Sequence, residues 1–196
     1  MTDRYPRRIV CLTEETCETL YLLGEQERIV GISGFTVRPP QARKEKPKVA
    51  AFTSARLDKI LALQPDLVLG FSDLQADIAA GLIRAGLAVH VFNQRTVAGI
   101  LDMIQTLGSL VGANRQATAL VHELQTGMDS VAQAAARLPR RPRVYFEEWD
   151  QPLISGIGWV SELIHIAGGE DCFAELAGAQ AARDRVIADP GEVVRR

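Results

Sequence analysis

Two pairs of adjacent glutamates are the residues of this chain best suited by type and spacing to do chemistry. Glu14-Glu15 and Glu147-Glu148 each end a short run of strand-type residues, and the two runs resemble one another. Two carboxylate pairs that face each other across a cleft can act as general acid and general base. They can equally accept hydrogen bonds from ligand amides or cap the helices that follow. A small α/β enzyme is therefore one alternative, although no nucleophile elbow, Walker loop or GxGxxG motif accompanies the glutamates.

The histidines and cysteines do not have the spacing of a metal site or a disulfide framework. His90 falls in a strand pattern, whereas His122 and His165 fall in helical patterns, so zinc-ligand spacing is absent. The cysteines are odd in number and form no CxxC motif: Cys11, Cys17 and Cys172. Cys11 lies in a strand pattern, and we expect it to be a small core residue. The sequence predicts neither a bound metal nor a cofactor.

Composition excludes some partners and leaves the compartment open. The 196 residues carry a net charge of −2 and are 47% hydrophobic. This balance provides enough apolar material for a core and no electrostatic case for nucleic acid or an anionic membrane. Residues 1–8 contain no apolar h-region, and no run approaches the length of a membrane span. As written, the chain is expected to stay in the cytoplasm, unless a leader precedes this sequence.

Strand-type runs alternate with helical patterns along the chain. Gly24, Gly86 and Gly112 each follow a helical pattern, as C-terminal glycine caps do. The alternation predicts parallel βαβ units. The expected strands are 8–12, 28–32, 67–71, 89–92 and 143–146, and the expected helices are 15–23, 57–63, 75–85 and 97–111.

Residues 57–71 describe one helix–strand step of such a fold. Pro65 ends the helix, because proline biases the preceding Gln64 away from helical dihedrals. The run that follows, 67–71, is apolar without alternation, which is typical of a parallel strand covered on both faces. Ligands of open α/β sheets meet the loops at the carboxyl ends of the strands. Here that loop is 71–73.

A long helical pattern at 114–138 interrupts the alternation. Its apolar residues recur at intervals of three and four, and such a helix is about 37 Å long. It suits a strut that joins two lobes, with a helix lying on one sheet as the alternative. Gly127 costs about 1 kcal/mol relative to alanine, so we expect packing to stabilise this helix. The predicted organisation is an N-terminal lobe at 1–112, a bridging helix at 113–138 and a C-terminal lobe at 139–196.

The C-terminal lobe repeats the beginning of the N-terminal lobe and then stops. Residues 143–148 resemble 8–15, 161–169 resemble 17–24, and 189–196 resemble the start of the helix at 54–63. In the first lobe that helix leads into a buried strand, whereas the second copy reaches Arg196 first. We therefore expect a shortened second lobe. Its uncovered edge and apolar surface would favour self-association and weaken or abolish ligand binding.

Together these segments resemble the periplasmic binding proteins of ABC importers for cobalamin and iron–siderophore complexes. In that class one long helix bridges two lobes. The Pro39-Pro40 segment and Phe52-Thr53-Ser54 look closest to the cobalamin branch. The resemblance implies an α/β fold of two Rossmann-like lobes with parallel sheets, the second lobe being incomplete here. The matching segments run through nearly the whole chain in the family's order: 8–24, 28–33, 39–40, 57–68 and 160–169.

The resemblance also implies a ligand, a site and no catalysis. A ligand would lie in the cleft between the lobes, against loops at the strand ends. Aromatic faces suit a corrin ring, and a few polar groups would orient its propionamide side chains. Core packing is the alternative role of each aromatic residue, and a ferric siderophore or haem-type chelate is the alternative ligand. The candidate ligand-binding residues are Phe35, Arg38, Phe52, Thr53, Phe71, Asn93, Trp149 and Trp159.

Permease subunits of an importer are the implied protein partner. In the family, one exposed carboxylate on each lobe docks into an arginine pocket of the permease. The matching position on the first lobe is Asp58, which is one carbon shorter than the usual glutamate. On the second lobe it falls near Gly191, and Glu192 is one residue away. The alternative for both is an ordinary solvated helix charge.

Overall fold

The computed structural model describes residues 4–196 and divides into two compact units. Unit 1 comprises Met1–Asn93 and Asp102–Val121, and unit 2 comprises Gln94–Leu101 and His122–Arg196. Among the described residues, no helix combines the length and the hydropathy that crossing a bilayer requires.

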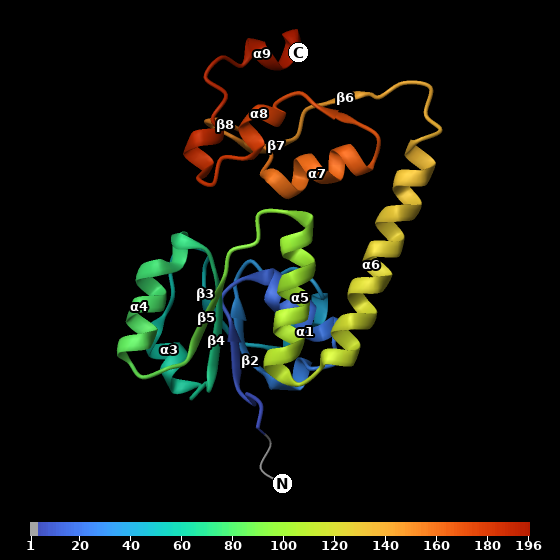
Figure 1. Cartoon of the computed structure of the whole chain (residues 1–196). Coiled ribbons are helices and arrows are strands. Elements are labelled where there is room, and N and C mark those ends of the chain that lie inside the picture. Colours follow the sequence, from blue (N-terminus) through green and yellow to red (C-terminus); the bar gives the residue numbers. More distant parts are fainter. Residues whose placement is uncertain (1–3) are drawn as a thin grey trace. The chain divides into compact units, whose positions relative to one another are not determined.

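Unit 1 is built on a parallel sheet of five strands in the order β3-β2-β1-β4-β5 (Figure 1). Val10 of the central strand β1 pairs with Gly31 on one side and with Val68 on the other. Since all five strands are parallel, their carboxyl ends lie at one edge, and the strand order reverses between β1 and β4. The strands are β1 (Ile9–Cys11), β2 (Ile29–Ser33), β3 (Lys48–Ala50), β4 (Leu67–Phe71) and β5 (Val89–Phe92). The predicted parallel α/β architecture is confirmed.

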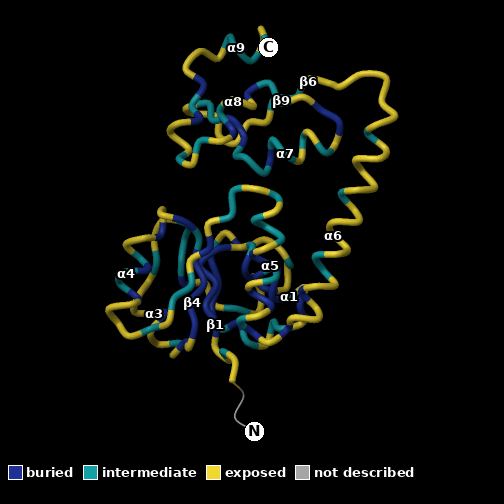
Figure 2. The backbone as a smooth tube through the Cα atoms, in the orientation of Figure 1, coloured by how far each residue is buried: buried dark blue, intermediate teal, exposed yellow. Residues whose placement is uncertain are grey.

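Helices cover both faces of this sheet. Figure 1 shows α3 and α4 on one side, and α1 and the Asp102–Val111 part of α5 on the other. Val10, Leu12 and Val68 form a core with Ile60 of α3 and Leu82 of α4. Figure 2 shows buried backbone concentrated along β1 and β4. The helices are α1 (Glu14–Leu22), α2 (Pro40–Glu45), α3 (Leu57–Ala62), α4 (Ala76–Arg84) and α5 (Val97–Val111), with the short 3₁₀ helices η1 (Gln26–Arg28) and η2 (Asp73–Gln75).

The predicted helix ends follow from local chemistry. Gly24, Gly86 and Gly112 have φ of 78°, 86° and 77°, the left-handed conformation that ends a helix at little cost to glycine. Gln64 has φ of 47°, which confirms that the residue before Pro65 leaves the helical region.

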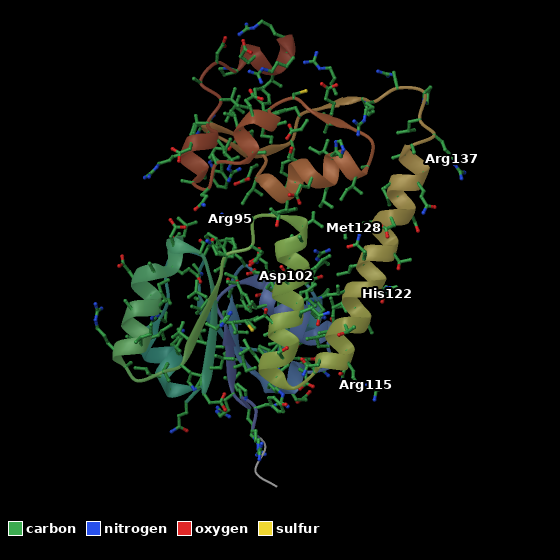
Figure 3. The ribbon with its side chains drawn as sticks, viewed as in Figure 1. Arg95, Asp102, Arg115, His122, Met128 and Arg137 are labelled. Atoms are coloured by element: carbon green, nitrogen blue, oxygen red, sulfur yellow. The ribbon has the colours of Figure 1, made fainter. Side chains whose placement is uncertain are left out.

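Helix α6 (Asn114–Ala135) is the predicted long helix, and its residues divide between the two units at Val121/His122. Side chains project along its length from Arg115 past Met128 (Figure 3). Nothing packs against the position of a side chain at Gly127, because a Cβ added there would meet nothing within 4 Å.

Unit 2 contains two strand pairs. Strand β6 (Arg143–Val144) is parallel to β9 (Glu170–Asp171), and β7 (Glu147–Asp150) is antiparallel to β8 (Leu153–Ser155). The expected strand 143–146 is thus only two residues long, and residues expected in a loop form β7. An antiparallel pair needs only a short connection, here Gln151-Pro152, whereas a parallel pair requires a long crossover. The remaining elements are α7 (Gly158–Ile166), α8 (Ala174–Ala177), η3 (Ala182–Arg185) and α9 (Gly191–Arg195).

Candidate ligand-binding site

The carboxyl edge of the unit 1 sheet brings six of the predicted site residues to one end of the unit. Each lies at or just beyond the end of a strand, so the parallel arrangement places their segments at the same edge. The six are Phe35 and Arg38 after β2, Phe52 and Thr53 after β3, Phe71 at the end of β4, and Asn93 after β5.

Large apolar side chains are exposed in these segments. Phe35 is 56% exposed, and two residues that the sequence did not single out, Val37 and Leu74, are 59% and 54% exposed. Phe52 and Phe71 are partly buried. Leu74 was overlooked because it precedes a segment that was expected to be helical. Its position could have identified it, because it is an apolar residue three positions beyond the end of a buried strand. Exposed apolar groups at one edge of a sheet make that edge a candidate surface for an apolar ligand.

The segment that carries Phe35 is tied down on both sides of this residue. Arg43 of α2 donates from one guanidinium nitrogen to the carbonyl oxygens of Gly34 at 2.8 Å and Thr36 at 2.9 Å. The Phe35 amide donates to the Ser33 hydroxyl at 3.2 Å. The exposed ring is therefore presented by a restrained backbone.

The end of β4 is strained. Ser72 has φ of 60° and ψ of 179°, a region that costs a non-glycine residue about 1–3 kcal/mol. Its amide donates to the carbonyl of Phe92 at 2.7 Å, which joins the ends of β4 and β5, and its hydroxyl accepts from the Leu74 amide. Strain of this kind is concentrated at functional sites.

The polar groups at this edge include neutral side chains and charged ones such as Arg38 and the exposed Asp73. Thr53 and Asn93 are exposed. Arg38 is the predicted cation, and its Nε lies 3.3 Å from the Glu18 carboxylate while 74% of its side chain stays exposed. An exposed pair of this kind is weak, so the guanidinium can reorient toward a ligand.

The two tryptophans lie in unit 2. Trp149 is in β7 and not in a loop, with 60% of the residue exposed, and its indole donates to the Gln151 carbonyl at 3.1 Å. Trp159 is in the first turn of α7, again not in a loop, and is partly buried. The sequence predicted a loop for each. Trp149 was missed because β7 is recognisable only from its pairing with β8. Trp159 was missed because α7 begins three residues before the helical pattern at 161.

A buried arginine anchors the hairpin that carries Trp149. Arg185 is only 2% exposed, and its guanidinium donates to the two carboxylate oxygens of Glu148 at 2.5 and 2.9 Å. It also donates to the Ser155 carbonyl at 2.5 Å. A bidentate pair of this geometry is among the stronger charge-assisted contacts. Neither Arg185 nor this pairing was foreseen, because 37 residues separate the partners.

The glutamates of the enzyme alternative are engaged within their own units. Thr13 donates to Glu15 at 2.7 Å, and Tyr145 donates to Glu147 at 3.2 Å. Burial and the nearby Glu147 carboxylate raise the pKa of Tyr145. Glu148 is the partner of the buried arginine. Three of the four predicted acid–base groups therefore have structural partners, which favours supporting roles over catalysis.

Unit 2 also holds a cavity of about 300 Å³, lined in part by Arg95, Gly158, Ser161 and Glu162. The Glu162 carboxylate accepts a hydrogen bond from the Val97 amide at 2.6 Å, so it caps the start of α5. Within the described part of the chain, no group of three or more His, Cys, Asp or Glu side chains is arranged to hold a metal ion.

The two predicted docking carboxylates are both paired within the chain, and Asp58 is exposed whereas Glu192 is half-buried. Asp58 faces the Arg56 guanidinium at 3.1 and 3.2 Å, and this hydrogen bonding lowers the pKa of Asp58. Glu192 accepts from Arg195 at 2.6 Å and from Arg196 at 3.1 Å, which lowers the pKa of Glu192. An arginine pocket on a partner would have to displace these weak surface pairs.

Comparisons with known proteins agree with this architecture. A cobalamin-binding protein of Halobacterium salinarum is 27% identical over 177 residues, which cover 89% of this chain and 48% of that protein. The chain therefore spans about half the length of this relative. The solved vitamin B12-binding protein of Vibrio cholerae matches with a TM-score of 0.78 and 21% identity, over 97% of this chain and 73% of that one. A haem-binding protein of Roseiflexus sp. RS-1 matches with a TM-score of 0.81 and 21% identity, over 96% and 73%.

At these identities the solved structures show a shared fold and no particular ligand. A family model described as periplasmic binding protein matches residues 9–194, nearly the whole chain. It spans the parallel sheet, the long helix and both strand pairs of unit 2. The chain belongs to the periplasmic binding protein family, a family of substrate-binding proteins and not of enzymes.

Proposed function

We propose that this chain binds cobalamin or a related corrinoid and delivers it to an ABC importer. The observation that carries the proposal is the carboxyl edge of unit 1, whose segments carry exposed apolar side chains together with the neutral polar groups of Thr53 and Asn93. Burial of a corrin face against Phe35, Phe52, Phe71 and Leu74 would supply about 25 cal/mol per Å² of apolar area before ordering costs. Thr53 and Asn93 would hydrogen-bond the propionamide groups.

The same edge is less suited to the alternative ligands of the family. An anionic ferric chelate is best held by several cations, whereas segments 33–38, 51–55 and 71–75 supply only one, Arg38. Haem is held through an axial His, Cys, Met or Tyr, and segments 33–38, 51–55 and 71–75 contain none of these. A corrinoid carries its own metal ligands and amides, so it requires apolar area and neutral hydrogen-bonding groups only.

A titration of the purified chain with aquocobalamin tests this function, followed by calorimetry and by the corrin absorption bands. Ferric siderophore and haemin serve as parallel ligands. We expect saturable, near-stoichiometric corrinoid binding. Phe35→Ala and Phe52→Ala should each weaken it by about tenfold, which corresponds to about 1.4 kcal/mol. Leu22→Ala is the matched control. Leu22 is also exposed, at 60%, but it is the last residue of α1, whereas the carboxyl edge of the sheet lies at the start of that helix.

Three outcomes would count against the proposal. Wild-type affinity in a Phe35→Ala, Phe52→Ala double variant would show that these aromatic residues do not bind the ligand. Binding of siderophore or haemin alone would keep the family and change the ligand. A folded chain that binds none of the three ligands would exclude corrinoid capture by this chain.

The importer is the proposed partner, with Asp58 and Glu192 as its docking carboxylates. Asp58→Lys and Glu192→Lys should each lower the stimulation of a cognate permease's ATPase without changing corrinoid affinity. Asp77→Lys on α4, an exposed acidic residue elsewhere on unit 1, is the charge-matched control. Equal loss in all three variants would show that net charge and not docking position matters.

A further inference from the structure

Gln75 occupies an unusual place for an amide side chain. It is the last residue of η2, just after β4, and it is fully buried at 0% exposure. Glutamine is seldom buried to this extent. It follows the end of β4, beside the point where the strand order reverses between β1 and β4. Reversal points of this kind are where open α/β sheets bind ligands. A buried amide needs hydrogen-bond partners, and those partners define its role.

The amide of Gln75 links the ends of three strands. Its Oε1 accepts from the Phe71 amide at 3.0 Å. Its Nε2 donates to the Phe52 carbonyl at 2.8 Å and approaches the Leu12 carbonyl at 3.5 Å. Phe71 ends β4, Phe52 follows β3, and Leu12 follows β1. A Cβ at Gly70 would lie 2.8 Å from the Gln75 Oε1, so a glycine leaves room for this arrangement.

We propose that Gln75 is a positioning residue that holds the backbones of Phe52 and Phe71 in place before the ligand arrives. It does not reach the surface, so it acts through these two aromatic residues and not by contact with ligand. The segment at 51–55 has few other restraints. The backbone amide of Ala51 donates to the Ser54 carbonyl at 2.7 Å, and Ala50 forms an isolated antiparallel β-bridge with Ala55. A pre-ordered site loses less conformational entropy on binding. For the ligand this inference rests on the corrinoid function proposed above.

Only a side chain that both donates and accepts can make these contacts. Once ionised, a glutamate accepts from the Phe71 amide but cannot donate to the Phe52 carbonyl; burial raises its pKa, so Gln75→Glu is measured above that pKa. A methionine of similar length makes neither bond and leaves both backbone groups buried and unpaired. Gln75→Glu and Gln75→Met therefore remove the two contacts in a graded manner while they preserve most of the side-chain volume.

Amide hydrogen exchange of the unliganded variants is the first measurement. In Gln75→Glu we expect faster exchange in residues 50–56, whereas the Phe71 amide stays protected. In Gln75→Met both segments should exchange faster. The corrinoid Kd should rise by about tenfold or more in Gln75→Met and by a smaller factor in Gln75→Glu, where a factor of ten corresponds to about 1.4 kcal/mol.

Asp66→Ala is the matched control for general destabilisation. The Asp66 carboxylate accepts from the Arg7 amide at 2.7 Å and the Arg8 amide at 2.9 Å, so it joins two segments at the opposite edge of the same sheet. Its loss should lower the denaturation midpoint and leave the corrinoid affinity unchanged. If Gln75 contributed only to global stability, Gln75→Met and Asp66→Ala would weaken corrinoid binding equally.

The inference is overturned by unchanged exchange in residues 50–56 and at Phe71 in both variants. It is also overturned by wild-type corrinoid affinity in Gln75→Met, or by an equal loss of affinity in Asp66→Ala. If the wild-type chain binds no corrinoid, the proposed function fails, and the exchange measurement on the unliganded protein still decides whether Gln75 holds the two segments.

Discussion

Two helical glycines meet opposite surroundings. In α5 a Cβ at Gly108 would lie 2.4 Å from the Cβ of Ala117 in α6. The two helices join through the tight turn at Gly112, so their backbones approach closely. In α6 a Cβ at Gly127 would meet nothing. A close contact thus requires glycine at position 108, whereas no contact requires it at position 127.

Gly127→Ala should therefore raise the free energy of unfolding by about 1 kcal/mol, which is the helix-propensity difference between the two residues. Gly108→Ala should lower it by about 1–3 kcal/mol, because the added methyl overpacks the contact with Ala117. Urea denaturation followed by circular dichroism measures both. A loss of stability in Gly127→Ala would show that another part of the protein packs against this position.

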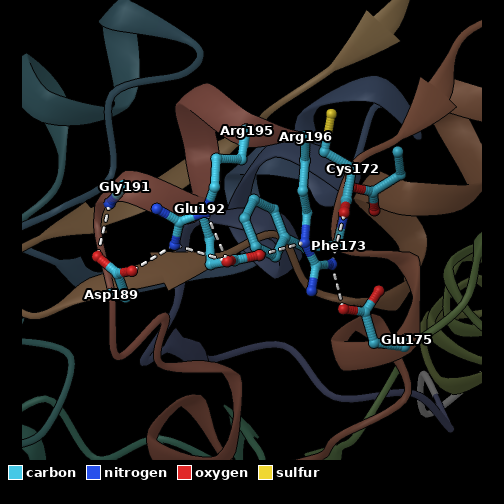
Figure 4. A network of polar contacts seen from close by, with 9 residues as sticks. Cys172, Phe173, Glu175, Asp189, Gly191, Glu192, Arg195 and Arg196 are labelled. Atoms are coloured by element: carbon cyan, nitrogen blue, oxygen red, sulfur yellow. Dashed lines mark hydrogen bonds and ion pairs between the residues drawn. The ribbon is translucent and has the colours of Figure 1, made fainter.

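At the scale of elements, α9 is held by charge rather than by its own helical propensity. Five residues are too few for a stable isolated helix. The Arg196 guanidinium pairs with Glu175 and Glu192 and lies 4.5 Å from the ring centroid of Phe173 (Figure 4). Arg195 pairs with Asp189 and Glu192. The segment is therefore expected to respond to pH and salt.

Hydrogen bonds from Arg196 lower the pKa of Glu175, and those from Arg195 lower the pKa of Asp189. A carboxyl group with a lowered pKa in the folded state stabilises that state above its ordinary pKa of about 4, and the contribution is lost as the pH falls through the lowered value. The protection factors of the amides of residues 187–196, which correct for the intrinsic pH dependence of exchange, should therefore fall as the pH falls below about 4. Arg196→Ala should raise the pKa of Glu175, as a carboxyl NMR titration would report.

Arg196→Lys is the matched variant for this network, because lysine keeps the charge and loses the planar fork. Its effect on the pKa of Glu175 should be intermediate. A Glu175 that titrates at its ordinary value in the wild-type chain would contradict the assigned pairing. High salt should accelerate exchange in the same segment, since exposed pairs are screened.

At the scale of the whole molecule, the apolar core is divided unequally between the two units. Among the described residues, the buried apolar side chains of unit 2 are few: Val160, Phe173, Ala177 and Ile187. The others belong to unit 1, around its five-stranded sheet. Hydrophobic burial is the main stabilising contribution to folding, so unit 1 should be the more stable part.

Native-state hydrogen exchange should show this difference directly. Amides of β1 and β4 should open with the highest free energy and those of β6 and β7 with a lower one, because opening free energies follow local burial. Denaturation should show two transitions that differ between probes. Coincident transitions and equal protection in both units would contradict an independent, weaker unit 2.

Much of unit 1 could be predicted from its sequence because its signals are local. The bounds of Leu67–Phe71, Val89–Phe92 and Val97–Val111 match the expected ranges, since hydrophobic period and the Pro and Gly that end each element act within a few residues. The strand-end rule also placed Phe35 and Phe71 at one edge, whereas Phe52 was named only through the family resemblance. Strand β3 and helix α2 were missed, because elements of three and six residues are too short to show a period.

What only the tertiary structure decided are the contacts between segments far apart in the chain. The antiparallel β7–β8 pair, the burial of Arg185 against Glu148 and the contacts of Gln75 with Phe52 and Leu12 all depend on partners that no local pattern reveals. A hydrogen bond between remote backbones leaves no periodic signal in either segment. The sequence by itself determined most helices and strands of unit 1, their parallel arrangement and the edge where a ligand would bind. The tertiary structure decided which side chains hold that edge, because only folding brings a donor and its distant acceptor within 3 Å of each other.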